Sequence, residues 1–574
     1  MLFRSRFFYR FPGHGTVPYG DHRGEGGLGS NGKDGMIAAA MQVATHTTGD
    51  PSIYKAARDY LAMSTLKSYP AMAVGHADGG RGDGMWRGTA ASYLRTQKPD
   101  DYRAMMDRIT WWFDLSRFHH GGVGIAAIGG FNDPASGAGN ALTYTAHLKN
   151  LRIHGAPKSK FAVDFKLPDH LWGRPADRRF LSIEHLPRFA EFGPELPPHR
   201  ILSALSHAYN NPDTADVPRE VLLQNLYHHR YMFRAQSAKA LAKAGDLKTI
   251  EQLLTEDDPR LRRTALDGIN DWRYWFAMGK GPIKPGQFTP GMIEAITAML
   301  TDPDEAWYVV EGALFAMHNM PADVIEKHLD AIMPWTTHEE WWLRQGAFMA
   351  LQGLDKDEAK YLKVLPTIMQ MVVDEYRTQP RSGMHWQLRR TLKRAGTDSE
   401  IGQIILTGMV RAAGESEIKP GLRQREGAWN VLNSIRIALE NKPNSAGELA
   451  ARLGQRLGHL DTGSLIEIID VGGSGSDGFY PMLAKLKGDA KQKLTDTLYD
   501  SYLPVMVQRL KDEPGTNLAL IDTVLRLKQL KQDVDGWEVV GKTAPAERVW
   551  RYVSIDPPTE DEQMHPRQRK RFRD

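Results

Sequence analysis

Apolar residues recur at intervals of three and four along most of this chain, the spacing that places them on one face of an amphipathic helix. In the first 155 residues this pattern predicts helices over residues 36–48, 52–69, 86–97, 101–118 and 140–153. Start signals agree, because Asp50-Pro51 and Asp100 stand at the beginning of the second and fourth helices and Asn140 is expected to cap the fifth. The pattern therefore favours an all-α protein.

The connections between these helices alternate in length. Long loops cover residues 11–35, 70–85 and 119–139, whereas short turns cover residues 47–52 and 97–101. Antiparallel helices joined in this way place every long loop at the same end, where loops carry function. We therefore expect residues 1–156 to form a partial α/α toroid of helical hairpins with three loops converging on one surface.

The pattern changes after residue 156. Residues 157–198 hold seven prolines and predict an extended connector. Residues 199–535 read as amphipathic helices with recurring Glu311-Gly312-Ala313, Gln345-Gly346-Ala347 and Glu426-Gly427-Ala428 segments, and Asp258-Pro259 and Asp302-Pro303 are each expected to open a helix. This region predicts a HEAT-like α-solenoid, with an irregular helical bundle as the alternative. Residues 536–574 predict a small hairpin, formed by residues 537–540 and 548–554, and a basic tail.

The composition of the chain excludes several kinds of site and partner. Of the 54 glycines, 24 lie in residues 1–157, and the chain has no cysteine, which excludes disulfides, thiolate zinc sites and cysteine nucleophiles. A net charge of +4 is too mild to indicate a nucleic-acid partner. The sequence contains neither a membrane-spanning apolar run nor the apolar core of a signal peptide. It thus predicts a cytoplasmic protein, or a periplasmic or extracellular one if its N-terminus is truncated.

The glycine-rich loops concentrate the side chains that do acid–base chemistry. Close backbone approach to a ligand requires glycine, whereas solvating a loop does not. We assign catalytic roles as general acid, general base or carboxylate partner to His14, Asp21, His76 and Asp83, and substrate-binding roles to Tyr19, Lys33, Arg81, Trp86 and Arg87. An oxygen- and nitrogen-rich metal site, or simple capping of turns, would use the same residue types, and no motif identifies a cofactor.

A phosphate-binding loop is the sharpest alternative for the first loop. Residues 27–33 match G-x-x-x-x-G-K, but Asp34 stands where a magnesium-binding hydroxyl is required, and no apolar strand precedes the loop. The sequence therefore argues against nucleotide binding.

The order of motifs in the loops resembles a known family. Gly13-His14-Gly15, Pro18-Tyr19-Gly20-Asp21, Asn31-Gly32-Lys33-Asp34-Gly35 and Gly75-His76 are similar to an uncharacterised bacterial domain family of α/α-toroid type, found in exported proteins of planctomycete-type bacteria. The resemblance covers about residues 10–155 and implies a toroid architecture with His14, Asp21, Lys33 and His76 as candidate positions. It implies no particular reaction.

Two functions follow as hypotheses. The first is a hydrolase or lyase that acts on a polysaccharide at the loop end of the toroid, by analogy with other toroid enzymes. The second is a non-catalytic interaction scaffold, in which the solenoid presents a concave face to another protein.

Overall fold

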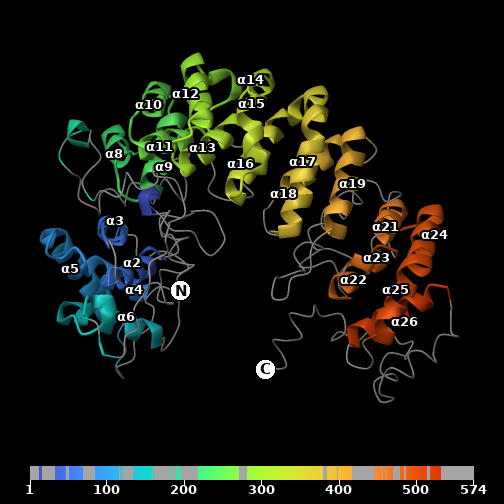
Figure 1. Ribbon diagram of the computed structural model, residues 1–574, viewed down its shortest axis with the longest axis horizontal. Helices are drawn as coiled ribbons and strands as arrows, with labels where there is room; N and C mark the ends of the chain where they lie inside the picture. Colours follow the sequence, from blue (N-terminus) through green and yellow to red (C-terminus); the bar gives the residue numbers. More distant parts are fainter. Residues whose placement is uncertain are drawn as a thin grey trace. The chain divides into compact units, whose positions relative to one another are not determined.

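A computed structural model describes about three fifths of the chain. The described residues are 12–15, 33–46, 51–68, 84–115, 117, 119, 134–157, 159–160, 183, 189–192, 194, 217–270, 281–378, 384–396, 399–415, 446–455, 457–459, 462–469, 479–483, 486–512 and 518–531. The chain divides into two compact units, Met1–Tyr361 and Leu362–Asp574. Across the described residues the chain forms helices and no strand, which confirms the all-α class (Figure 1).

The N-terminal part of the first unit is a set of packed helices, with a short 3-10 turn, η1 (Pro12–His14), before them. They are α2 (Lys33–Ala44), α3 (Ser52–Ser68), α4 (Gly84–Ser92), α5 (Pro99–Leu115) and α6 (Pro134–Thr145), followed by the 3-10 turns η3 (Ala146–Leu148) and η4 (Arg152–His154). Helix α2 lies against α3 and α4, and α4 lies against α6. Their core is rich in alanine, with Ala38, Ala57 and Ala90 fully buried, which lets the helices approach closely.

The contact between α4 and α6 requires a residue without a side chain. A Cβ atom at Gly88 of α4 would lie 2.1 Å from the Oγ1 atom of Thr143 on α6. Thr143 is itself buried. Glycine at this position therefore sets how closely α4 and α6 pack.

Every helix predicted in this part exists, but some limits were wrong. Helix α6 begins at Pro134, so Asn140 lies inside the helix and is not its cap; proline is tolerated in the first turn because its missing N–H has no helical partner there. Helix α4 ends at Ser92, and residues 93–97 form turns. Asp100 lies in the first turn of α5, after Pro99.

The remainder of the first unit is a helical solenoid. Its helices are α8 (Arg219–Asn225), α9 (Tyr231–Lys243), α10 (Leu247–Leu254), α11 (Pro259–Ile269), α12 (Pro290–Thr301), α13 (Trp307–Met317), α14 (Ala322–Lys327), α15 (Leu329–Ile332) and α16 (Trp341–Gln352). Helices α9, α11, α13 and α16 stack in sequence as an inner row, and α10 and α12 form an outer row against α11 and α13. Figure 1 shows this stack in green. It matches the predicted solenoid.

The recurring glycine segments are packing positions of the inner row. A Cβ atom at Gly312 of α13 would lie 3.0 Å from Leu266 of α11, and one at Gly346 of α16 would lie 3.0 Å from Leu314 of α13. The glycine of the preceding inner helix, Gly268 of α11, lies against Ala238 of α9 in the same way. The repeat thus keeps a small residue where each inner helix crosses the one before it. Residues 426–428, the third predicted copy, lie outside the described residues.

The predicted Asp-Pro start signals gave opposite results. Asp258 caps α11 by accepting a hydrogen bond from the backbone N–H of Arg260 at 2.9 Å, with Pro259 as the first helical residue. Asp302-Pro303 was wrong as a helix start, because α13 begins only at Trp307. The Asp302 side chain instead accepts from the backbone N–H of Asp304 at 2.8 Å, which closes a turn after α12.

The second unit is also helical. It includes α18 (Met384–Ala395), α19 (Glu400–Glu415), α21 (Ala446–Gly454), α22 (Thr462–Ile469), α23 (Phe479–Leu483), α24 (Gly488–Thr497), α25 (Leu503–Asp512) and α26 (Leu518–Gln529), and α17 (Glu358–Thr378) contains the boundary between the units. A π-helical turn at Leu498–Tyr502 joins α24 to α25, and the buried Tyr502 hydroxyl donates to the Ala450 carbonyl of α21 at 3.0 Å. This bond fixes α21 against the following helices.

The predicted connector and the predicted C-terminal features fall on undescribed parts of the chain. The terminal hairpin of residues 537–540 and 548–554 and the basic tail lie outside the described residues, as does most of the connector 157–198. The described helices include none with the length and apolar character needed to cross a lipid bilayer. The division into residues 1–156, 157–198, 199–535 and 536–574 stays a prediction.

Candidate functional site

The described residues include four of those to which the sequence assigns a functional role. His14, Trp86 and Arg87 have described side chains, and Lys33 begins α2. The remaining candidates lie outside the described residues: Tyr19, Asp21, His76, Arg81 and Asp83. Their proposed roles therefore stay predictions.

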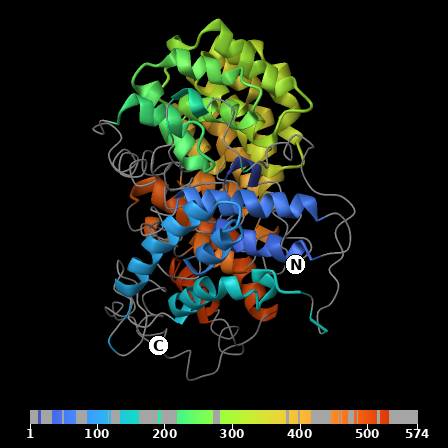
Figure 2. The same cartoon turned by 90° about the vertical axis from the view of Figure 1, so that its left-hand side faces the viewer.

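His14 lies in the interior of the first unit, where η1 meets the inner row of the solenoid. Figures 1 and 2 both show η1, in dark blue, between α3 and the green helices of the stack. The His14 ring stacks on Tyr308 of α13, with centroids 4.8 Å apart and planes 19° apart, and lies 4.1 Å from the Tyr231 ring of α9. The Trp307 ring lies with its centroid 6.1 Å from that of His14 and its plane at 72° to it. Three aromatic side chains thus surround one imidazole.

The backbone of the same segment is recognised by a buried arginine. Arg234 of α9 is 0% exposed, and it donates to the carbonyl oxygens of His14 at 2.6 Å, His228 at 2.6 Å and His229 at 2.8 Å. The backbone N–H of Tyr231 donates to the Gly15 carbonyl at 3.2 Å. We call the side chains of Tyr231, Arg234, Trp307 and Tyr308, with the His229 carbonyl, the His14 seat.

Glycine at position 15 is required by the geometry of this seat. Gly15 has a φ of +83°, in the left-handed region, and a Cβ atom there would lie 2.2 Å from the His229 carbonyl oxygen. Any side chain would meet both the backbone strain and the backbone atom of the seat. The Gly13-His14-Gly15 motif is thus shaped, at least at its last residue, by contact with the solenoid.

A network of buried charged side chains contacts the His14 seat through Tyr231. Arg263 of α11 donates to Asp267 at 3.0 Å and to Glu311 of α13 at 2.9 Å, and the Tyr231 hydroxyl donates to Asp267 at 3.2 Å. All four side chains are buried. Since buried charges are tolerated only when they are paired and hydrogen-bonded, this network fixes α9, α11 and α13 relative to one another.

The electrostatics of the seat keep its histidine neutral. Burial, with the nearby cations Arg263 and Arg234, holds the pKa of His14 well below its usual value. His228 behaves in the same way, because burial and then neighbouring His229 and cationic side chains lower its pKa. Neither ring is a proton carrier at neutral pH. Among the described residues the Nδ1 atom of His14 has no hydrogen-bond partner, whereas the ring contacts both Tyr231 and Tyr308.

A second polar cluster lies where the first two glycine-rich loops end. A Cβ atom at Gly35, in the first turn of α2, would lie 2.9 Å from the Trp86 backbone of α4, so the two helices begin side by side. Asp34 pairs with Arg230 of the solenoid at 3.3 Å, and both side chains are buried. Burial, followed by Arg230, lowers the pKa of Arg87 to about 9, while Asp34 opposes that shift.

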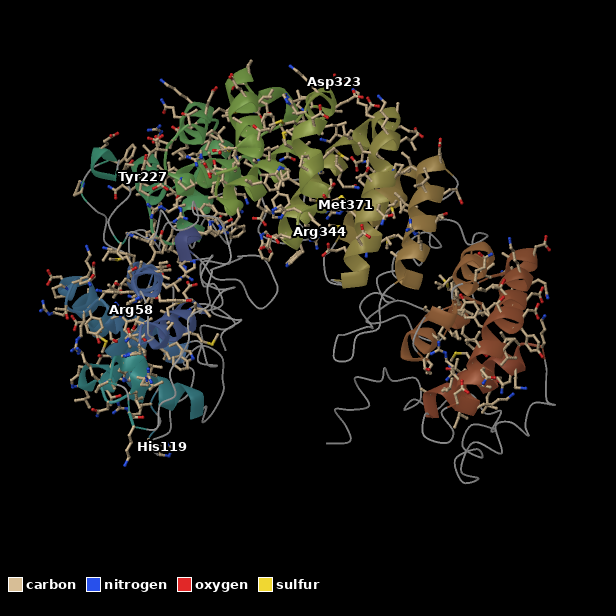
Figure 3. The ribbon with its side chains drawn as sticks, in the orientation of Figure 1. Arg58, His119, Tyr227, Asp323, Arg344 and Met371 are labelled. Carbon is tan, nitrogen blue, oxygen red and sulfur yellow. The ribbon has the colours of Figure 1, made fainter. Side chains whose placement is uncertain are left out.

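Two histidines of the glycine-rich loops lie far from each other in the structure. His14 is 1% exposed inside the unit, whereas His119 of the third loop is exposed. Figure 3 shows His119 at the end of the N-terminal helices that points away from the solenoid. The structure brings together the ends of the first two loops, and it separates these two histidines.

Sequence reasoning missed the solenoid side of both clusters. Arg230, Tyr231 and Arg234 come from the start of α9, within a segment that was read only as a repeat helix. A signal was present: Arg234 follows Phe233 in an apolar helical stretch, and a cation at such a position needs buried acceptors. Among the described residues, His, Asp and Glu side chains form no group suited to hold a metal ion.

Comparisons with known proteins bear on the N-terminal part. The profile of a family described as a domain of unknown function, DUF6288, matches residues 2–155. This agrees with the extent of the resemblance seen in the loop motifs, while a planctomycete-type origin and export stay predictions. The search of curated proteins gave no match.

One solved structure similar to the chain is that of Kap121p bound to Pho4p. The identity is 11%, and the alignment covers 91% of this chain and 70% of Kap121p, with a TM-score of 0.21. A TM-score of this size carries no argument, so the solenoid assignment stands on the stacking of the helices themselves.

Proposed function

We propose that this chain is a helical-repeat interaction scaffold, in which the solenoid carries the N-terminal helices in a fixed position. The observation that supports this proposal is the junction: the His14 seat and the Asp34–Arg230 pair join the two parts through buried contacts. Stacked repeats offer long surfaces for partners. A rigidly attached second domain extends that surface.

The outer row is the part of the solenoid that a partner can reach. The inner helices α11 and α13 are buried along almost their whole length. Lys248 on α10, Glu294 on α12, and Asp323 and Lys327 on α14 are exposed, and Figure 3 shows Asp323 at the surface of the stack. The concave-face arrangement expected from the sequence is therefore replaced, in this proposal, by a mixed-charge outer surface.

Proximity labelling in the source organism, followed by reconstitution with the purified partner, tests the scaffold. We expect the double variant Lys248→Glu, Lys327→Glu to weaken binding at least about tenfold and to leave the melting temperature unchanged. The reason is that charged residues at an interface attract the correct partner by complementary charge, and a reversed charge repels it. Arg103→Glu, an exposed substitution on α5, serves as the control and should leave the affinity unchanged. Equal loss with both variants, or no loss with either, would contradict the outer surface as the binding face.

A hydrolase or lyase acting on a polysaccharide is the second candidate, favoured by one specific observation. The helices that follow the first two glycine-rich loops begin beside each other, with Trp86 and Arg87 at the start of α4 and Lys33 at the start of α2. Loops that end together are suited to surround one ligand. In this proposal Asp21, His76 and Asp83 supply the acid–base groups, and Tyr19, Arg81 and Arg87 bind the substrate.

An activity screen separates the two candidates. The full chain is incubated with acidic and neutral polysaccharides, and new reducing ends or unsaturated products are measured. The enzyme proposal expects turnover that Asp21→Ala and His76→Ala abolish while the chain stays folded; full activity in both variants would remove these residues from it. Polymer binding without any product favours the scaffold.

A further inference from the structure

The inner row of the solenoid is covered by more than its own repeats. In a two-layer stack of hairpins the outer helices cover one face of the inner helices and leave the opposite face open. Here Tyr231, Arg234 and Tyr308 on the inner row are buried, and each of them contacts His14, a residue from the beginning of the chain. Part of the inner face is thus occupied by a short segment far away in sequence.

The contacts to this segment have the character of peptide recognition. Arg234 and the Tyr231 N–H bind carbonyl oxygens of residues 14 and 15, which every peptide possesses. The aromatic rings of the seat contact one side chain, that of His14. In peptide-binding domains, hydrogen bonds to the peptide backbone supply affinity and contacts to particular side chains supply specificity. The contacts to residues 14 and 15 are of these two kinds.

Two features of the seat restrict what it accepts. A flat, uncharged ring is required between Tyr231 and Tyr308, because Arg234 and Arg263 disfavour a cation there. The next residue must be glycine, because a Cβ atom would meet the His229 carbonyl oxygen at 2.2 Å and the backbone has a positive φ. Together these features select an uncharged aromatic ring, as His14 supplies, followed by a glycine.

We propose that the His14 seat is a peptide-binding site for a Pro-Gly-His-Gly segment, which the chain's own residues 12–15 fill in cis and a partner protein carrying the same segment fills by exchange. Covalent connection gives the cis segment an effective concentration in the millimolar range. A partner segment therefore binds well only when residues 12–15 leave the seat. Exchange would detach η1 from the solenoid and give the scaffold a second, occupiable surface.

Gly15→Ala in the full chain tests this proposal, because the new Cβ atom prevents residues 12–15 from seating. A fluorescently labelled peptide of residues 9–18 is added, and binding is measured by anisotropy. We expect the Gly15→Ala chain to bind the peptide at least about tenfold more tightly than the unchanged chain. Gly245→Ala is the matched control, since Gly245 also has a positive φ of +84° but has no atom within 4 Å of its Cβ position; it should behave like the unchanged chain.

Peptide variants test the specificity. Peptides carrying His14→Ala or Gly15→Ala should bind the Gly15→Ala chain at least about tenfold more weakly than the natural sequence. If the Gly15→Ala chain does not melt cooperatively, a His14→Ala chain replaces it, and the natural peptide should raise its melting temperature but not that of the unchanged chain. Equal binding to the unchanged and Gly15→Ala chains, no binding to the substituted chains, or indifference to the peptide's histidine would each overturn the proposal.

Discussion

At the scale of single residues, the solenoid helices beside the junction contain buried arginines that are paired with carboxylates. Arg263 has Asp267 and Glu311, and Arg260 has Asp258 at 2.7 Å. The sequence singled out His14, but Tyr231 and Tyr308 lie far along the chain, and no local pattern pairs residues at such separations. Chemistry-bearing residues could be predicted, whereas their neighbours required the fold.

Removing the cation from the network should destabilise the first unit strongly. In Arg263→Ala, Asp267 and Glu311 lose their shared partner inside the protein, and breaking a buried pair in this way costs about 3–5 kcal/mol. Urea denaturation of the full chain measures the loss. Arg103→Ala is the control: its ion pair with Asp100 is 72% and 93% exposed, and such pairs contribute about 0–1 kcal/mol. Similar losses of unfolding free energy for both variants would show that the buried network stabilises the first unit no more than an exposed ion pair does.

At the scale of helices and loops, periodicity predicted the existence of the elements better than their ends. Helix α3 was predicted almost to the residue, because Pro51 and Ser52 give a clear start. Helix α6 begins six residues before Asn140, since a sequence rich in alanine and glycine gives no apolar period to locate its first turn. The close approach of α4 and α6 at Gly88 also has no local signal.

Gly88→Ala should destabilise the N-terminal helices, against the usual trend for a helix interior. Alanine normally stabilises a helix by about 1 kcal/mol relative to glycine, but here its Cβ atom would meet Thr143 at 2.1–2.6 Å. Overpacking of this kind costs about 1–3 kcal/mol. Circular dichroism melting checks the sign. Gly286→Ala, where no atom lies within 4 Å of the Cβ position, should change the melting temperature little, and a stabilised Gly88→Ala chain would refute the close contact.

At the scale of the whole molecule, the first unit joins residues that the sequence assigns to separate domains. The segment 12–15 belongs to the matched N-terminal family region, yet its contacts lie on α9 and α13 of the solenoid. Two histidines, His14 and His228, are enclosed and neutral because residues 12–15 pack against the solenoid. Their burial makes the stability of the unit depend on pH.

The first unit should lose stability as the pH falls from 7 to 5.5. His14 and His228 have folded-state pKa values well below the ordinary 6.5 because they are buried, so the unfolded chain takes up protons first. Their stabilising effect is complete above pH 6.5 and declines below it, by about 1.3 kcal/mol for each histidine over this interval. His46 and His154 shift in the same direction.

His14→Phe isolates one part of this dependence, because phenylalanine keeps an aromatic ring in the seat and cannot be protonated. Urea denaturation at the two pH values should show a decline smaller by about 1.3 kcal/mol than that of the unchanged chain. An unaltered pH dependence would mean that His14 titrates normally and is not enclosed.

Hydrogen exchange at the Tyr231 amide tests the central claim most directly, because that N–H donates to the Gly15 carbonyl across the junction. We predict slow exchange in the unchanged chain and in Gly245→Ala, and exchange at least about tenfold faster in Gly15→Ala, where the segment cannot seat. Fast exchange in the unchanged chain, or equal protection in Gly15→Ala, would contradict the docking of residues 12–15 on the solenoid.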